Sequence, residues 1–85
     1  MTLKEYIKNP DLFKWNGKEE VDLRVLRKDG LPFTAIDGTI YESYNCDFID
    51  YDFAPDQVFA EWYSCEFIKE VVSCDMVRTI LIKLP

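Results

Sequence analysis

The chain of 85 residues combines 48% hydrophobic and 15% aromatic residues with a formal net charge of −6. This apolar content excludes intrinsic disorder, and a chain of this length builds one core, so residues 1–85 are expected to form a single domain. No stretch resembles a signal peptide or approaches the ~18 apolar residues of a membrane span. The composition therefore predicts a cytoplasmic protein that does not contact a membrane.

The chain is poor in the residues that usually carry chemistry. It has three cysteines, Cys46, Cys65 and Cys74, without a CxxC pair, and it has no histidine. The odd number argues against a disulfide framework or zinc site and favours reduced cysteines packed as small apolar residues. Without histidine, Ser–His and Cys–His nucleophile pairs and the commonest metal ligand are missing. We expect no enzyme, no cofactor and no metal.

The first element predicted in the chain is a short helix. Thr2 is a suitable N-cap, and Glu5 follows it at the spacing of a capping box. The helix is expected over residues 3–8, with Tyr6 and Ile7 turned toward the core.

A connection and a strand follow. In residues 11–18, three apolar side chains are expected to pack against the core: Leu12, Phe13 and Trp15. Residues 21–25 alternate apolar and charged side chains, and this period of two predicts a half-buried strand.

The middle of the chain carries further extended segments. Strands are predicted over 33–36 and 39–44, joined by a tight turn at Asp37-Gly38. Residues 49–53 fit either a short strand or an ordered loop.

A helix and a hairpin close the chain. Pro55 suits the first turn of a helix over 55–62. Residues 65–72 and 76–84 predict a hairpin, and the apolar run 80–82 places its second strand in the centre of the sheet. The predicted fold class is α+β: a small antiparallel sheet, made of a meander and the C-terminal hairpin, with short helices packed on one face.

Charge is distributed very unevenly along the chain. All ten Lys and Arg lie within 4–28 or 69–83, so residues 29–68, which we call the acidic tract, contain no cation. The acidic tract holds nine carboxylates: Asp29, Asp37, Glu42, Asp47, Asp50, Asp52, Asp56, Glu61 and Glu66. Two interpretations stay open, a solubilising surface and a single-sign field that acts on a partner.

Two other uses of the acidic tract fit poorly. An EF-hand loop beginning at Asp50 places Asp52 and Glu61 correctly, but it puts Ala54 and Pro55 where an oxygen ligand and a Gly are needed. The many aromatic rings suggest base stacking, yet phosphate would be repelled by the acids around them, so direct nucleic-acid binding is disfavoured.

Tyr and Trp side chains flanked by carboxylates suit docking onto a basic protein surface. In this interpretation the acids imitate a phosphate backbone and the aromatic residues anchor the contact. The predicted partner-binding residues are Asp47, Asp50, Asp52, Asp56, Glu61, Tyr51, Trp62 and Tyr63.

In its length, its lack of a cysteine framework and its acidic tract, the chain resembles the small acidic inhibitors that phages encode against host defences, including anti-CRISPR proteins and other DNA mimics. The resemblance implies a stoichiometric inhibitor in the host cytoplasm that occupies a basic nucleic-acid-binding surface of its partner. The alternative is a structural or homo-oligomeric interaction module, such as a phage accessory protein or a homodimer, whose acids only aid solubility. A small enzyme or calcium-binding protein is a third hypothesis.

Overall fold

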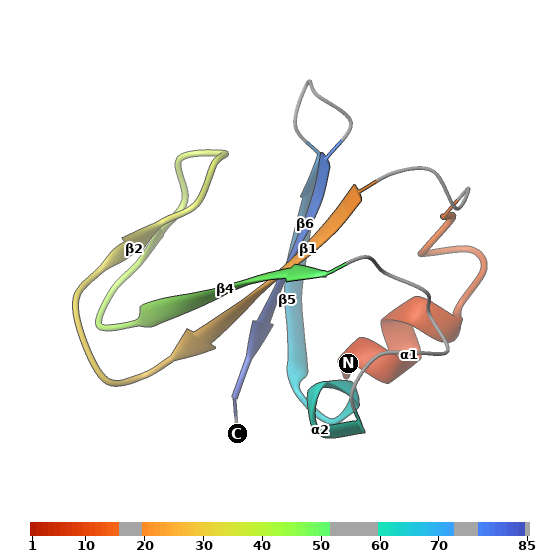
Figure 1. The fold of residues 1–85 in the computed structure, drawn as a ribbon, viewed down its shortest axis with the longest axis horizontal. Coiled ribbons are helices and arrows are strands. Elements are labelled where there is room, and N and C mark those ends of the chain that lie inside the picture. The colour runs from red at the N-terminus through yellow and green to blue at the C-terminus, as the bar shows by residue number, and fades with distance from the viewer. Residues whose placement is uncertain (16–19, 52–59, 73–76, 85) are drawn as a thin grey trace.

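The first helix forms where its capping residues predict it. The computed structural model describes residues 1–15, 20–51, 60–72 and 77–84. Helix α1 spans Leu3–Lys8 (Figure 1). Thr2 Oγ1 accepts from the backbone N–H of Glu5 at 3.2 Å, and Glu5 Oε1 accepts from the N–H of Thr2 at 2.9 Å. The capping box is confirmed, as is the burial of Tyr6 and Ile7.

Four long strands form the main sheet. They are β1 (Glu20–Arg27), β4 (Asn45–Tyr51), β5 (Glu66–Val72) and β6 (Val77–Lys83). Their order across the sheet is β4-β1-β6-β5, so β1 and β6 are central and β4 and β5 are the edges. This confirms the central position predicted for the last strand.

Strand pairing in this sheet is mixed. β4 pairs antiparallel with β1, and β5 pairs antiparallel with β6. β1 and β6, however, run parallel, with Leu23 beside Ile80. Parallel neighbours cannot be joined by a tight turn, and here most of the chain lies between them.

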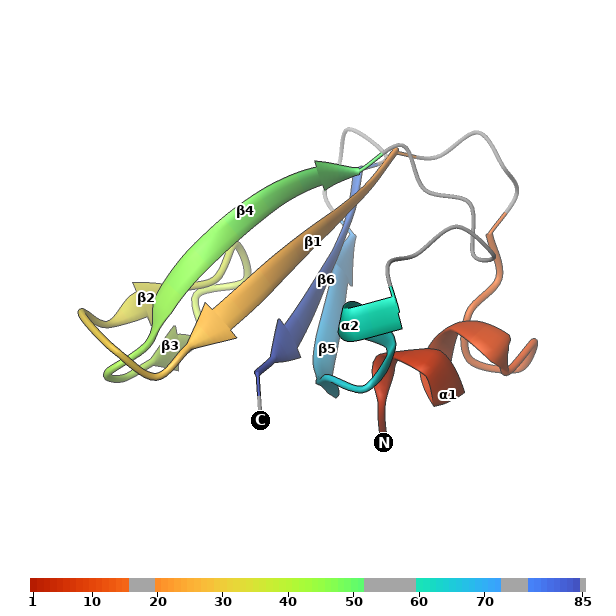
Figure 2. The same cartoon turned by 60° about the horizontal axis from the view of Figure 1, so that its bottom comes forward.

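A small second sheet leaves the main one between β1 and β4. Strands β2 (Phe33–Thr34) and β3 (Ile40–Tyr41) pair antiparallel. Their turn is closed by the N–H of Ala35 donating to the carbonyl of Thr39 at 2.8 Å. Gly38 adopts a φ of 88°, which favours glycine. In Figure 2 this hairpin lies at the opposite end of β1 and β4 from the two helices.

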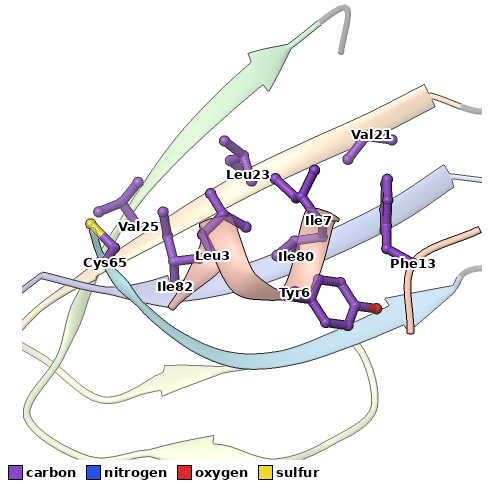
Figure 3. Packing of buried hydrophobic residues seen from close by; sticks show 10 residues of the cluster. All are labelled: Leu3, Tyr6, Ile7, Phe13, Val21, Leu23, Val25, Cys65, Ile80 and Ile82. Atoms are coloured by element: carbon purple, nitrogen blue, oxygen red, sulfur yellow. The ribbon is translucent and has the colours of Figure 1, made fainter. Parts of the chain in front are cut away.

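The hydrophobic core lies between α1 and one face of the main sheet. Side chains from α1, β1 and β6 meet there, together with Phe13 and Cys65 (Figure 3). The ring of Tyr6 stacks on Phe67 of β5 with 3.9 Å between centroids. Trp15 packs at the margin of this core, as expected, whereas Leu12 is exposed, so its prediction is wrong.

The opposite face of the sheet is also buried at its centre. Leu26 of β1 and Leu81 of β6 are each 1% exposed. Asp22, between the two apolar positions Val21 and Leu23, is buried as well. The strand predicted over 21–25 is therefore confirmed within β1, but its predicted half-burial is wrong. β1 is covered on both faces, as expected of a central strand with a parallel neighbour.

The predicted α+β class, a small antiparallel sheet with short helices packed on one face, is wrong, whereas the antiparallel pairing of the two C-terminal strands is confirmed. The fold is mostly β, with two sheets, and the described helices are only α1, of six residues, and α2 (Ala60–Tyr63), of four. The sequence suggested a meander because each turn signal is local, whereas the contact of β1 with β6 joins distant parts of the chain. Neither described helix is long and apolar enough to cross a membrane.

Other predicted elements differ from the observed ones in length. The strands expected over 33–36 and 39–44 shrink to two residues each. Residues 49–51 belong to β4, which begins already at Asn45. Most of the helix predicted over 55–62, and the turn predicted at 73–75, lie outside the described residues.

Candidate protein-binding surface

Six of the predicted partner-binding residues lie on two described elements, and the other two lie outside the described residues. Asp47, Asp50 and Tyr51 belong to the edge strand β4, and Glu61, Trp62 and Tyr63 belong to α2. Asp52 and Asp56 lie outside the described residues, and the described side chains do not include those of Asp50, Tyr51 or Glu61.

Cations from the two ends of the chain fold back onto the acidic tract. Arg27 Nε lies 3.2 Å from Asp47 Oδ2 and 3.8 Å from Asp29 Oδ2. Lys69 Nζ, on β5 of the main sheet, is paired with Asp37 Oδ2 in the turn of the hairpin. Among the carboxylates of the tract whose side chains are described, Glu42 and Glu66 form no ion pair. Asp29, Asp37 and Asp47 therefore do not belong to an unopposed row of carboxylates.

The Asp37–Lys69 pair changes the proton affinity of both groups. Hydrogen bonding to Lys69, and then to the backbone N–H of Thr39, lowers the pKa of Asp37 to about 2. The same hydrogen bond raises the pKa of Lys69 above its usual value. Both groups stay charged at neutral pH, so this pair fastens the hairpin to β5.

The two predicted aromatic anchors on α2 are partly committed to packing. Trp62 and Tyr63 are half-buried and lie against the core between α1 and the sheet. The Nε1–H of Trp62 is buried and has no acceptor among the described residues. The indole nitrogen is thus turned inward, which leaves less of the ring available to a partner.

The hairpin and its flanks expose large aliphatic side chains that the sequence did not single out. Leu31, Ile36 and Ile40, which we call the hairpin residues, are 76%, 67% and 62% exposed. Leu31 stands between a glycine and a proline, a context that fits neither strand nor helix. This context was the available sequence signal that Leu31 is exposed. Ile36 and Ile40 gave none, because an extended segment predicts burial on alternate residues.

Three contacts hold the hairpin against the main sheet. The guanidinium of Arg24 lies 5.6 Å from the ring of Phe33, in addition to the pairing of Lys69 with Asp37. Asn45 Oδ1 accepts from the N–H of Leu31 at 3.2 Å. The exposed aliphatic groups therefore stand on a support that is fixed at three points.

The described cysteines are not arranged in a way that suggests a catalytic or metal-binding role. Cys65 is buried in the core and Cys46 is half-buried, while Cys74 lies outside the described residues. Burial raises the pKa of the Cys46 thiol. Within the described part of the chain, no group of three or more His, Cys, Asp or Glu could hold a metal.

A shallow hollow lies where the N-terminus meets the ends of β5 and β6. Its lining combines acids, a cation and apolar groups: Met1, Thr2, Glu5, Ser64, Glu66, Lys83 and Leu84. This mixture gives the hollow no preference for one charge or for an apolar ligand.

No protein-family model, curated protein or solved structure matches the chain.

Proposed function

We propose that the protein is a non-enzymatic interaction module that binds another polypeptide through the hairpin residues. The observation that carries this proposal is the exposure of Leu31, Ile36 and Ile40, each of which has more than 60% of its surface in contact with water. Burying one such side chain at an interface contributes roughly 1.5–3 kcal/mol. Several large apolar side chains exposed on one small element and its flank suggest a binding site.

The attachment of the hairpin supports the same proposal. An element that is already fixed loses less conformational entropy when it binds. The Asp37–Lys69 pair and the Asn45–Leu31 hydrogen bond supply that fixation. The acids of the surrounding surface keep the apolar groups in solution until the partner covers them.

The test is affinity capture on the immobilised full chain from an extract of the cells that encode it. The hairpin variant carries Leu31→Ser, Ile36→Ser and Ile40→Ser. The control variant carries Leu12→Ser and Val72→Ser, which change exposed apolar residues elsewhere. We expect a partner that the wild type and the control retain at low and high salt and that the hairpin variant loses. Equal retention by all three proteins, or none by the wild type, contradicts the proposal.

A second candidate function is the acidic inhibitor that occupies a basic nucleic-acid-binding protein. It is favoured by Glu42, an exposed carboxylate beside the hairpin that has no ion pair among the described residues, and by the net charge of −6. Its weakness is that Asp29, Asp37 and Asp47 already meet cations.

The capture experiment also separates these two functions. Binding through acids weakens steeply as salt rises, because screening removes the attraction between exposed charges. It should also be lost in a variant with Asp47→Lys and Asp50→Lys and survive in the hairpin variant. Binding through the hairpin residues should instead persist at high salt. It should survive in the variant with Asp47→Lys and Asp50→Lys and be lost in the hairpin variant.

A further inference from the structure

The two edge strands of the main sheet differ in whether other backbone segments cover them. At the β5 edge, the N–H of Phe67 donates to the carbonyl of Met1 at 2.8 Å, and the N–H of Leu3 donates to the carbonyl of Cys65 at 2.9 Å. The N-terminus thus covers the start of β5. Strand β4 has β1 on one side and, among the described residues, no strand on the other. A seven-residue edge strand with no described neighbour on its outer side is a template for a further strand.

An exposed ring marks the midpoint of this edge. Phe48 is the fourth of the seven residues of β4 and is 51% exposed. Its ring lies 4.9 Å from the guanidinium of Arg24, its neighbour on β1, so Arg24 covers part of the ring. The remaining surface of Phe48 is free to pack against a strand added at the open edge.

The sequence of β4 is compatible with pairing to itself. An antiparallel pair of identical strands has a two-fold axis, and only an axis through position 48 pairs all seven residues. In that register Asp47 lies opposite position 49 of the second copy, and Asp50 lies opposite position 46. Each acidic position is therefore opposite an uncharged one in the register, whereas moving the axis to between 48 and 49 would put positions 47 and 50, both Asp, opposite each other.

We propose that β4 pairs antiparallel with β4 of a second copy of this chain about a two-fold axis through Phe48, which joins the two four-stranded sheets into one. The two Phe48 rings then lie side by side on the axis. This contact uses the β4 edge rather than the hairpin residues. The dimer therefore presents two sets of hairpin residues, one from each copy.

Salt gives this dimer a distinctive signature. Each chain carries a net charge of −6, so two copies repel one another at low ionic strength. Screening shortens the range of that repulsion from ~30 Å at 0.01 M salt to ~8 Å at 0.15 M. Self-association should therefore strengthen as salt is added, which is opposite to the binding of a basic partner.

Sedimentation velocity on the full chain tests the pairing. We expect the 10.1 kDa chain to double in mass with rising concentration, up to about 200 µM, and to do so more readily at about 0.5 M salt. Phe48→Glu places two carboxylates together on the axis and should abolish the dimer. Ile40→Glu adds the same charge on the hairpin and should leave it intact. A wild type that stays monomeric, or equal effects of the two variants, overturns the proposal.

A cross-linking variant keeps the test decisive if Phe48→Glu fails to fold. Opposite residues of antiparallel strands lie about 4.5–5.5 Å apart at Cα, within the range that a disulfide spans. In a background with Cys46→Ser and Cys74→Ser, Phe48→Cys should oxidise to a covalent dimer, and the control Ile40→Cys should not. No cross-link at position 48, or equal cross-linking at both positions, rejects the β4 pairing. The outcome of this cross-linking test does not depend on whether the hairpin residues bind a partner, so the two proposals can fail separately.

Discussion

Glu70 is the residue on which three segments of the chain converge. Its carboxylate accepts a hydrogen bond from the hydroxyl of Tyr6 on α1 and pairs with Arg78 on β6. Arg78 in turn donates to the carbonyl of Lys14 at 2.8 Å and lies 4.4 Å from the ring of Phe13. Because both charged side chains are nearly buried, each depends on the other.

Glu70→Gln should therefore be strongly destabilising. The substitution keeps the size of the side chain but removes one partner of a nearly buried ion pair, which costs about 3–5 kcal/mol. The free energy of unfolding in urea measures the loss. The matched control is Glu66→Gln, on the same strand but exposed and without an ion pair among the described residues, which should change stability by less than about 0.5 kcal/mol. Similar losses in both variants would contradict the role assigned to Glu70.

Tyr6 makes stability sensitive to alkaline pH. Burial, and then the hydrogen bond to Glu70, raises the pKa of Tyr6 above its usual value of 10.0. The folded state therefore holds this proton more tightly than the unfolded chain does. The stabilisation from Tyr6 is complete below the unfolded pKa and is lost as pH rises above it.

A comparison with Tyr6→Phe isolates that titration. Between pH 10 and 11 the wild type should lose stability more steeply than the variant, by up to about 1.4 kcal/mol per pH unit. The other tyrosines are common to both proteins and cancel. Urea unfolding at each pH gives the two curves, and parallel curves would show that Tyr6 does not titrate differently in the fold.

At the scale of elements, the hairpin depends on its attachment. β2 and β3 contribute two residues each, too few to be stable by themselves. Asp37 is their link to β5 through Lys69. Because its folded pKa is about 2, below the usual 3.8, this link is present above pH 4 and is lost as pH falls toward 2.

Asp37→Asn should loosen the hairpin without unfolding the protein. Asparagine keeps an oxygen acceptor for the N–H of Thr39 but loses the ion pair. We expect faster hydrogen exchange at the amides of Ala35 and Gly38, whose hydrogen bonds close the turn, with little change in global stability. The control Glu42→Gln, near the hairpin but unpaired among the described residues, should leave these rates unchanged. Unchanged exchange in Asp37→Asn would mean that the ion pair does not hold the hairpin.

At the scale of the whole molecule, the centre of the sheet is buried on both faces. Leu23 lies on the face that α1 covers, and Leu81 lies on the other. Leu81→Ala should therefore cost about 2–5 kcal/mol, as much as Leu23→Ala, although no described helix covers that face. Leu12→Ala, at an exposed position, is the control and should cost far less. Unfolding in urea measures all three, and a small loss for Leu81→Ala would show that its face is loosely packed.

Elements with local signals were predictable from the sequence. The helix at 3–8 follows from Thr2 and Glu5, since a capping box lies entirely within one turn. The strand at 77–83 follows from its run of β-branched and aliphatic residues. The length of β4 was missed because it begins with Asn45 and Cys46, which carry no strong strand signal.

The candidate surface was predictable only in part. The sequence identified the acidic tract, and Asp47 does lie exposed on the edge strand. It did not identify the hairpin residues, because the exposure of Ile36 and Ile40 depends on where the short hairpin leaves the main sheet. It also missed the pairing of Asp37 with Lys69, residues 32 positions apart in the chain.

The sequence by itself determined the charge asymmetry, the capped first helix and the central last strand, because composition and local periodicity do not depend on which distant segments meet. Only the tertiary structure decided that β1 and β6 run parallel, that these two central strands are buried on both faces and that cations from outside the acidic tract reach it. These features come from contacts between distant residues, whose partners and register no local pattern specifies.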